Sequence, residues 1–386
     1  MTTYEFASPE TRDNPYPLFH RLREHDPVYA TDFGYWYVSR YEDVVSLLRD
    51  PRLTSGQGVP DSLGVTEGPL RAIMDSWMMA LDGPAHARTR NLVSRAFTPR
   101  AVEAMRPSIT EVTDQLVSTL VDRQGGDIIE HLAFPLPMDV TRRMFGVDAP
   151  TWDREVVGLF DPARRGQAGG FVEAMAALAE FLEVFVPGRA AGGETDLFAA
   201  LMAPDETGNR LSDLEKVANA VLLVTAGFET TMSLITLAVW TLLTHPDQLQ
   251  RLRGDWSLAR NAVEEVLRYE PAALWTSRFA TEDIDVAGVV IPRGSNVLFS
   301  SVAANRDPAR FDDPDRFDIG RADIRPVTFG GGVHSCLGAA LARLEAEVAI
   351  TTLFQRAPTI SLVTKDVSWQ DGNPSVRRPT LVEVAM

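Results

Sequence analysis

The chain has 386 residues, of which 45% are hydrophobic and 23% charged, values typical of a globular protein with a sizeable core rather than of a disordered or fibrous chain. Its formal net charge of -16 disfavours nucleic acid and anionic lipid surfaces, so neither is expected as a partner. The only cysteine, Cys336, excludes an internal disulfide and a zinc site built from four thiolates.

No long linker rich in proline, serine or glycine interrupts the chain, so we expect one domain over residues 1–386. The start, from Met1 to Pro9, lacks the basic region and apolar run of a signal peptide. The protein is therefore expected in the cytoplasm, where a free thiol stays reduced.

Most of the chain carries apolar residues at a spacing of three and four, which predicts helices over 40–48, 85–97, 100–121 and 171–185. Strand-like runs are fewer, at 35–38, 285–291 and 296–299, with Gly288 and Pro292-Arg293-Gly294 as turns. The fold class expected is mainly α with small β-sheets.

Residues 219–243 are almost wholly apolar and long enough to cross a bilayer. Glu229 would then lie near the hydrocarbon midplane at a cost of several kcal/mol, and no basic cluster marks a cytoplasmic flank. Ser212 and Glu215 form a capping box that would start a helix, and His245-Pro246 would end it. A buried helix is therefore favoured over a membrane span.

The run from Phe329 to Gly338 contains three consecutive glycines and Cys336, and it precedes an amphipathic stretch at 341–353. This placement puts Cys336 near a helix N-terminus, where backbone N–H groups and the helix dipole favour the metal-binding thiolate. Glycines let the backbone curl around the sulfur. A glycine-rich turn with a buried, inert cysteine is the alternative interpretation.

This run resembles the cysteine loop of the cytochrome P-450 superfamily, matching its signature at Phe329, Gly330, Gly332, His334, Cys336 and Gly338. The resemblance is to the soluble bacterial class and covers essentially the whole chain. It implies a cytochrome P-450 fold, a triangular prism of about a dozen helices around one haem. It further implies haem b as cofactor, with Cys336 as the axial ligand whose thiolate favours O–O bond cleavage.

A second matching element is Ala226-Gly227-Phe228-Glu229-Thr230, where the family carries an acid and an alcohol beside the oxygen site. Reduction of O2, the expected co-substrate, consumes two protons. We therefore assign Thr230 as a hydrogen-bond donor and Glu229 as a proton relay. Gly227 leaves room for oxygen, and Ala226 and Gly227 are expected to contact the haem.

Glu265 and Arg268 lie three residues apart, which puts them on one helix face. Alone, such a pair is usually a solvated surface pair. In the family the same Glu-x-x-Arg is a buried structural lock to the segment before the cysteine loop, here residues 315–321.

The resemblance also implies cationic partners for the two haem propionates, namely His86, Arg90, Arg278 and His334. The substrate would be lined by Leu222, Thr225, Ala226, Leu274 and Trp275, with residues 55–80 as a lid. The apolar side chains of that lid suggest a mostly apolar or aromatic small molecule. Ordinary helix packing explains several of them equally well.

The expected activity is a monooxygenase reaction, as a tailoring step in bacterial secondary metabolism. No flavin or NAD fingerprint is present, so electrons should come from a separate ferredoxin and an NAD(P)H-dependent ferredoxin reductase. Arg88, Arg95 and Arg343 are candidates for the docking patch, and a monomer is expected.

Two alternatives stay open. One is a haem-thiolate enzyme that performs oxidative coupling, desaturation, epoxidation, nitration or peroxide-driven oxidation, since it would share these motifs. The other is a non-catalytic haem-binding sensor, which is disfavoured because no signalling or DNA-binding segment is visible.

Overall fold

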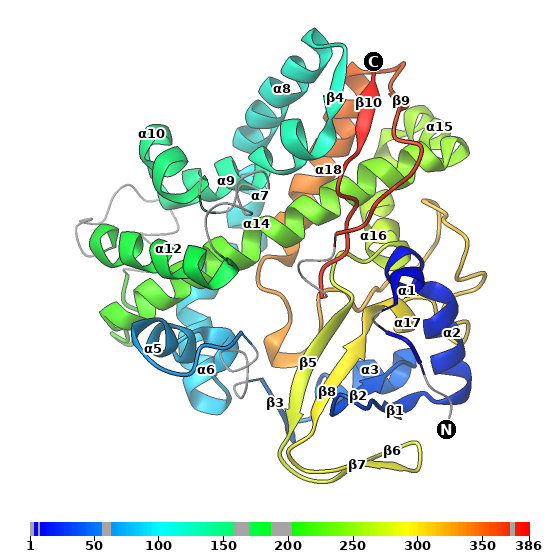
Figure 1. Cartoon of the computed structure of the whole chain (residues 1–386). Helices are drawn as coiled ribbons and strands as arrows, with labels where there is room; N and C mark the ends of the chain where they lie inside the picture. Colours follow the sequence, from blue (N-terminus) through cyan, green and yellow to red (C-terminus); the bar gives the residue numbers. More distant parts are fainter. Residues whose placement is uncertain are drawn as a thin grey trace. The chain divides into compact units, whose positions relative to one another are not determined.

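The computed structural model describes residues 4–6, 8–55, 63–157, 159, 170–186, 203–370 and 375–386. Over these residues the protein is mainly helical with small sheets, as predicted (Figure 1). The chain forms two compact units, one made of Met1–Thr54, Arg106–Leu136 and Thr230–Met386, the other of Ser55–Met105 and Pro137–Glu229. The single-domain organisation stays a prediction.

The first unit contains a five-stranded sheet in the order β1-β2-β8-β5-β3. Strands β2 and β8 are parallel and all other neighbours are antiparallel. Apolar side chains such as Val38, Val297 and Phe299 are buried in its core. The bounds are β1 Val28–Ala30, β2 Tyr35–Val38, β3 Leu53–Thr54, β5 Trp275–Ala280 and β8 Asn296–Ser300.

Two smaller sheets complete this unit: a three-stranded one in the order β4-β10-β9 and a β6–β7 hairpin. The hairpin turns at Ala287 and Gly288, both at positive φ, within the run predicted as strand at 285–291. The bounds are β4 Gly125–Asp127, β9 Ser361–Leu362, β10 Glu383–Ala385, β6 Ile284–Val286 and β7 Val289–Ile291.

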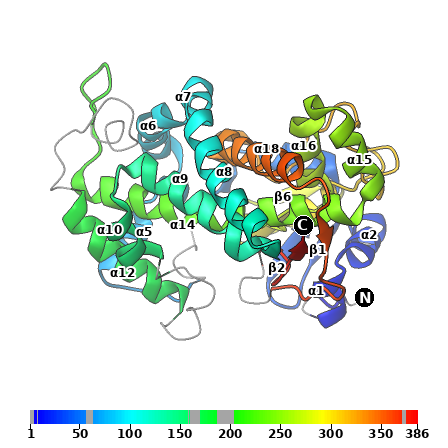
Figure 2. The same ribbon diagram turned by 90° about the horizontal axis from the view of Figure 1, so that it is seen from above.

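Helices α8 and α16 both pack against α18, the helix that follows the cysteine loop (Figure 2). The helices of the first unit are α1 Pro9–Asp13, α2 Tyr16–His25, α3 Tyr41–Leu47, α8 Arg106–Asp122, α15 Pro246–Gly254, α16 Ala259–Tyr269, α17 Ser301–Ala304 and α18 Ala339–Arg356. Short η elements lie at Ile129–Ala133, Trp256–Leu258 and Gly332–His334. Helix α9, Pro135–Phe145, begins in this unit and continues into the second.

The elements described in the second unit are helices, and α12 packs on α5. Helix α12 has the predicted bounds of 171–185. The helices lying in this unit are α5 Pro69–Asp75, α6 Gly83–Val93, α7 Pro99–Ala104, α10 Ala149–Trp152 and α12 Phe171–Phe185, with η elements at Met78–Ala80, Ser94–Phe97 and Asp153–Val157.

The single helix predicted over 100–121 is wrong in one respect, because α7 ends at Ala104 and α8 begins at Arg106. Pro107 lacks the N–H that would bond back to the carbonyl of Glu103, so a continuous helix cannot pass this point.

The long apolar helix, α14 Asp213–Thr244, begins in the second unit and ends in the first. The capping box is present: the amide of Ser212 donates to Glu215, and the amide of Glu215 donates to the Ser212 hydroxyl at 3.2 Å. Its most apolar window has a mean hydropathy of 1.6 yet is 78% buried within the protein. A buried core helix is thus the interpretation that fits, as predicted.

Candidate functional site

The loop that carries Cys336 is shaped by glycines. Gly330 and Gly332 have φ of +66° and +68°, a region that other residues rarely adopt. The amide of Cys336 donates a 2.9 Å hydrogen bond to the carbonyl of Phe329, which closes the loop. The thiol of Cys336 is exposed, so the alternative of a buried, inert cysteine does not hold.

The loop leads directly into α18, whose N-cap is Gly338. Cys336 therefore lies two residues before the cap of an 18-residue helix, where the backbone dipole favours an anionic sulfur. A Cβ added at Gly330 would lie 3.9 Å from the hydroxyl oxygen of Thr276, which places the loop beside β5. Strand β5 also carries Trp275 and Arg278.

Arg343 supports the cysteine loop from within the protein. Its guanidinium lies 4.4 Å from the ring centroid of Phe329 and pairs with Glu264 at 2.5 Å. This contact restrains the Phe329 ring at the start of the cysteine loop. Arg343 was a candidate for the docking patch, and its charge is paired with Glu264 instead.

The central part of α14 has an unusual exposure pattern. Ala226 and Thr230, four residues apart on one face, are exposed, whereas Thr225, Phe228 and Glu229 are buried. A Cβ added at Gly227 would meet nothing within 4 Å. Ala226 and Thr230 therefore form an accessible face on a helix whose neighbouring residues are largely buried.

Thr225 and Leu222 differ from that face. Both are buried, with exposed fractions of 7% and 5%, and the Thr225 hydroxyl donates to the carbonyl of Val221 at 2.9 Å. Their proposed contact with a substrate would need the apolar parts of these side chains.

Leu274 and Trp275 belong to the first unit, at the start of β5. They pack against an apolar cluster that includes Tyr37, and the Trp275 ring meets the Tyr37 ring edge-on at 6.2 Å. Both residues are only partly buried, so each retains accessible surface.

The expected propionate partners come from both units. His86 and Arg90 lie one turn apart on α6, with His86 only 3% exposed. Arg278 and His334 belong to the first unit, where Arg278 is buried and donates to the carbonyl of Ser277 at 2.7 Å. Each is a cation or a donor of the kind that holds carboxylates.

The segment expected to act as a lid shows that packing explains much of its apolar content. Ile73, Met74, Trp77 and Met78 are each less than 9% exposed. Residues 56–62 of this segment lie outside the described residues. The apolar residues of 63–78 therefore say less about a substrate than their number suggests.

Glu265 and Arg268 are fully buried and form a two-bond ion pair, each bond 2.7 Å long. Arg268 also donates to the carbonyls of Asn305, Pro314 and Arg316. Glu265 accepts from the amide of Asp318 and pairs with Arg321. The pair thus joins α16 to the segment before the cysteine loop.

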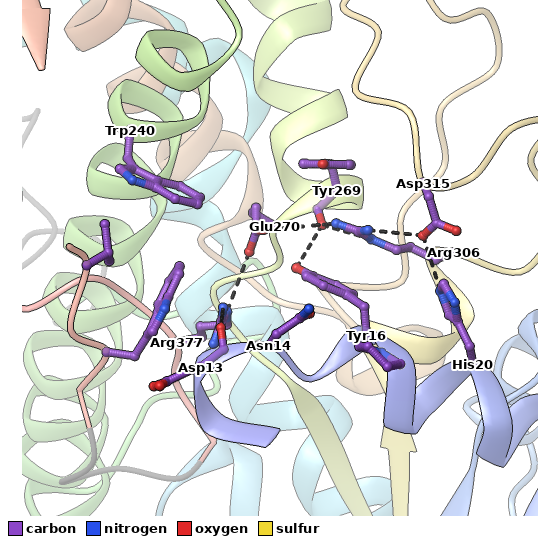
Figure 3. Close-up of a pocket in the computed structure, with 13 residues that line it drawn as sticks. Asp13, Asn14, Tyr16, His20, Trp240, Tyr269, Glu270, Arg306, Asp315 and Arg377 are labelled. Carbon is purple, nitrogen blue, oxygen red and sulfur yellow. Dashed lines mark hydrogen bonds and ion pairs between the residues drawn. The ribbon is translucent and has the colours of Figure 1, made fainter. Parts of the chain in front are cut away.

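A second group of buried charges was not singled out from the sequence: Glu270, Arg306 and Arg377, each at most 5% exposed. They line a cavity of about 560 Å³ in the first unit (Figure 3). Its lining includes none of the candidate site residues. These three residues could not be predicted as a group from the sequence, because they lie far apart along the chain.

The other two arginines proposed for docking lie in the second unit. Arg88 pairs with Glu215, and Arg95 donates to the carbonyl of Pro204 at 3.0 Å. Both contacts remain within that unit, and Arg343 belongs to the first.

Comparison with known proteins identifies the family of the chain. Residues 188–358 match the family model described as Cytochrome P450. The chain is 38% identical to Cytochrome P450 107B1 of Saccharopolyspora erythraea, covering 96% of this chain and 94% of that protein. It is 39% identical to 6-deoxyerythronolide B hydroxylase of the same organism, with 92% of each covered.

Solved structures extend the likeness to the fold. P450BioI, solved in complex with an acyl carrier protein ligated to hexadec-9Z-enoic acid, superposes with a TM-score of 0.88 at 34% identity, covering 98% of this chain and all of that one.

Proposed function

The chain belongs to the cytochrome P450 family and is an O2-using monooxygenase, and we propose that Cys336 is the axial thiolate ligand of its haem b. The observation that carries this proposal is the exposed thiol of Cys336, held by a glycine-shaped loop before α18. When bound, the haem supplies the iron chemistry that activates dioxygen.

The donor set of the chain fits such a group. The thiol lies where backbone dipoles stabilise its anionic form, and Phe329 is held beside it by Arg343. His86, Arg90, Arg278 and His334 would hold the two propionates, whose burial requires charged partners. Gly338 and Ala226 would also contact the haem.

We assign the proton steps to α14. The hydroxyl of Thr230 lies on the exposed face and would donate a hydrogen bond to bound oxygen. Glu229, only 6% exposed, would carry protons to that face. Gly227 keeps the face free of side-chain bulk.

The substrate we propose is a mostly apolar or aromatic small molecule, modified in a tailoring step of bacterial secondary metabolism. A relative named for hydroxylating 6-deoxyerythronolide B supports this class. The accessible surfaces of Ala226, Leu274 and Trp275 would contact the substrate, and Leu222 and Thr225 would back them. Product analysis separates hydroxylation from coupling, desaturation, epoxidation or nitration.

Electrons would come from a ferredoxin and its NAD(P)H-dependent reductase, with the enzyme working as a cytoplasmic monomer. Support is limited to the family, whose bacterial members use separate redox partners. Because Arg88, Arg95 and Arg343 have internal contacts, the docking patch need not use them.

The experiment is the absorption spectrum of the dithionite-reduced protein under carbon monoxide, compared between wild type, Cys336→Ser and Ser335→Ala. Thiolate ligation requires a strongly red-shifted Soret band in wild type and Ser335→Ala only. A haem band that is absent, or that survives the Cys336 substitution, would refute the proposal.

A further inference from the structure

A buried ion pair joins the segment after α16 to the C-terminal part of the chain. The carboxylate of Glu270 lies 3.5 Å from Nε of Arg377 and 3.9 Å from the guanidinium of Arg306 (Figure 3). Among the described residues, neither Oε2 of Glu270 nor Nε of Arg377 has a hydrogen-bond partner. Charge attraction between two largely buried groups therefore holds them together.

Arg377 is fixed on its other sides as well. Its guanidinium donates to the carbonyls of Arg12 and Asp13, the last two residues of α1. It also stacks 3.4 Å from the ring centroid of Trp369, which meets Trp240 of α14 edge-on at 5.3 Å. The side chain thus anchors residues 375–377 to α1 and to the core helix.

The anchored residues in turn hold the chain just before β5. The amide of Arg377 donates to the carbonyl of Ala272 at 2.8 Å, and the amide of Leu274 donates to the carbonyl of Ser375 at 2.9 Å. Ala273 and Val376 form the antiparallel bridge between them. Residues 272–274 are therefore held on one side by a segment that Arg377 fixes.

This short backbone pairing leads directly to Leu274 and Trp275, the residues of the first unit expected to contact the substrate. Among the described residues, two hydrogen bonds and one bridge set the register of this pairing, while the amide of Ser301 also donates to the carbonyl of Leu274 at 2.9 Å. A displacement of Arg377 would therefore shift residues 272–274 on one side of Leu274 while β8 holds the other side. A pair that touches no substrate can thereby influence which substrate fits.

We infer that Arg377, held by Glu270, is a positioning residue that sets the placement of residues 272–275 and thereby the shape selectivity of the oxidation site. The inference rests on the proposed function for its substrate contacts. The positioning of residues 272–274 rests on the ion pair, the stacking on Trp369 and the backbone pairing, and needs no haem.

Two variants test the inference, so that one remains if the other fails to fold. Arg377→Lys keeps the charge but loses the planar fork that reaches two carbonyls and stacks on Trp369. Glu270→Gln keeps the shape but removes the negative charge. The matched control is Leu252→Ala, a fully buried residue of α15 whose truncation lowers stability without touching residues 272–277.

The first readout is hydrogen–deuterium exchange of the haem-loaded protein. The amides of Leu274 and Arg377 should exchange about tenfold faster in both variants than in wild type, since their opening becomes easier. In Leu252→Ala, these two amides should gain no more exchange, relative to wild type, than the amides of β8 do.

The second readout is the ratio of dissociation constants for imidazole and 4-phenylimidazole, measured by optical titration. Both probes bind through the same ring nitrogen, so their ratio reports the space around the site. It should change by about threefold to tenfold in both variants and stay constant in the control. An unchanged ratio or unchanged exchange in both variants would overturn the inference.

Failure of the proposed function looks different. In that case wild type would lack the red-shifted carbon monoxide band, and neither imidazole would produce a haem spectrum. The exchange result would still report whether Arg377 positions residues 272–274.

Discussion

Gly332 lies against the backbone of Leu48 so closely that a Cβ at Gly332 would overlap the carbonyl oxygen of Leu48. The cysteine loop therefore lies against the end of α3, where backbone contact leaves no room for a side chain at position 332.

Substituting Gly332 by alanine should displace the loop, because the added methyl group collides with backbone and φ is +68°. We expect loss of most haem from Gly332→Ala after purification, measured as the ratio of Soret to protein absorbance. Gly254→Ala is the control, since Gly254 ends α15 outside the proposed haem site and a Cβ there meets nothing within 4 Å. Equal haem retention in Gly332→Ala and wild type would contradict this account.

Removing the charge of Glu265 should destabilise the protein strongly. Glu265→Gln leaves the fully buried guanidinium of Arg268 without its counter-charge, at a cost of about 3–5 kcal/mol. Arg251→Ala breaks the exposed pair with Asp318 and should cost less than about 1 kcal/mol. Urea unfolding monitored by circular dichroism compares the two, and similar losses would argue against a structural lock.

The hydroxyl and the carboxylate of α14 should affect turnover without affecting haem binding. In Thr230→Ala and Glu229→Gln we expect an unchanged carbon monoxide spectrum. Product formation should be about a hundredfold slower, with NAD(P)H consumption diverted to hydrogen peroxide, because proton delivery is impaired. Thr231→Ala, a buried neighbour on the same helix, is the control. Normal coupling of NAD(P)H to product in both variants would refute the assigned roles.

Glu345 should make stability depend on pH. It lies fully buried in α18, and burial raises the pKa of its carboxyl to about 8 from an ordinary value of 4.5. The folded state then binds the proton more tightly than the unfolded state does. The stabilisation that comes from the protonated carboxyl is therefore fully present below pH 4.5 and is lost as the pH rises to about 8.

Glu345→Gln stays neutral and should escape this loss. The free energy of unfolding of Glu345→Gln minus that of wild type should be larger at pH 9 than at pH 5 by about 3–5 kcal/mol. Thermal unfolding across this range provides the measurement, with Glu347→Gln, whose partner is Arg106, as the control. A pH-independent difference between Glu345→Gln and wild type would show that the carboxyl is already ionised.

Local sequence signals predicted those parts of the fold that depend on neighbouring residues. The capping box of Ser212 and Glu215, the end of α14 before Pro246, and the bounds of α12 and β2 follow from spacing and from proline. The position of Cys336 before a helix followed from the apolar pattern after the glycines.

Long-range partners could not be predicted in this way. Strand β5 was not among the strands predicted from the sequence, and it forms because β8 and β3 flank it. The burial of Ile73 and Met74, and the ion pair of Glu270 with Arg377, depend on segments that no spacing brings together. For the same reason, the sequence left open whether apolar side chains of 63–78 line a pocket or fill the interior, and the structure buries Ile73, Met74, Trp77 and Met78.

The small β4-β10-β9 sheet has a consequence for biosynthesis. Strand β4, at Gly125–Asp127, pairs with β10, at Glu383–Ala385, and the amide of Val382 bonds to Asp127 across 255 positions. At a translation rate of about 5–20 residues per second, β4 leaves the ribosome many seconds before its partner. Throughout that interval its edge is an unpaired template for other nascent chains. The yield of folded protein in the cell should therefore depend on how well chaperones shield that edge until the last strand emerges.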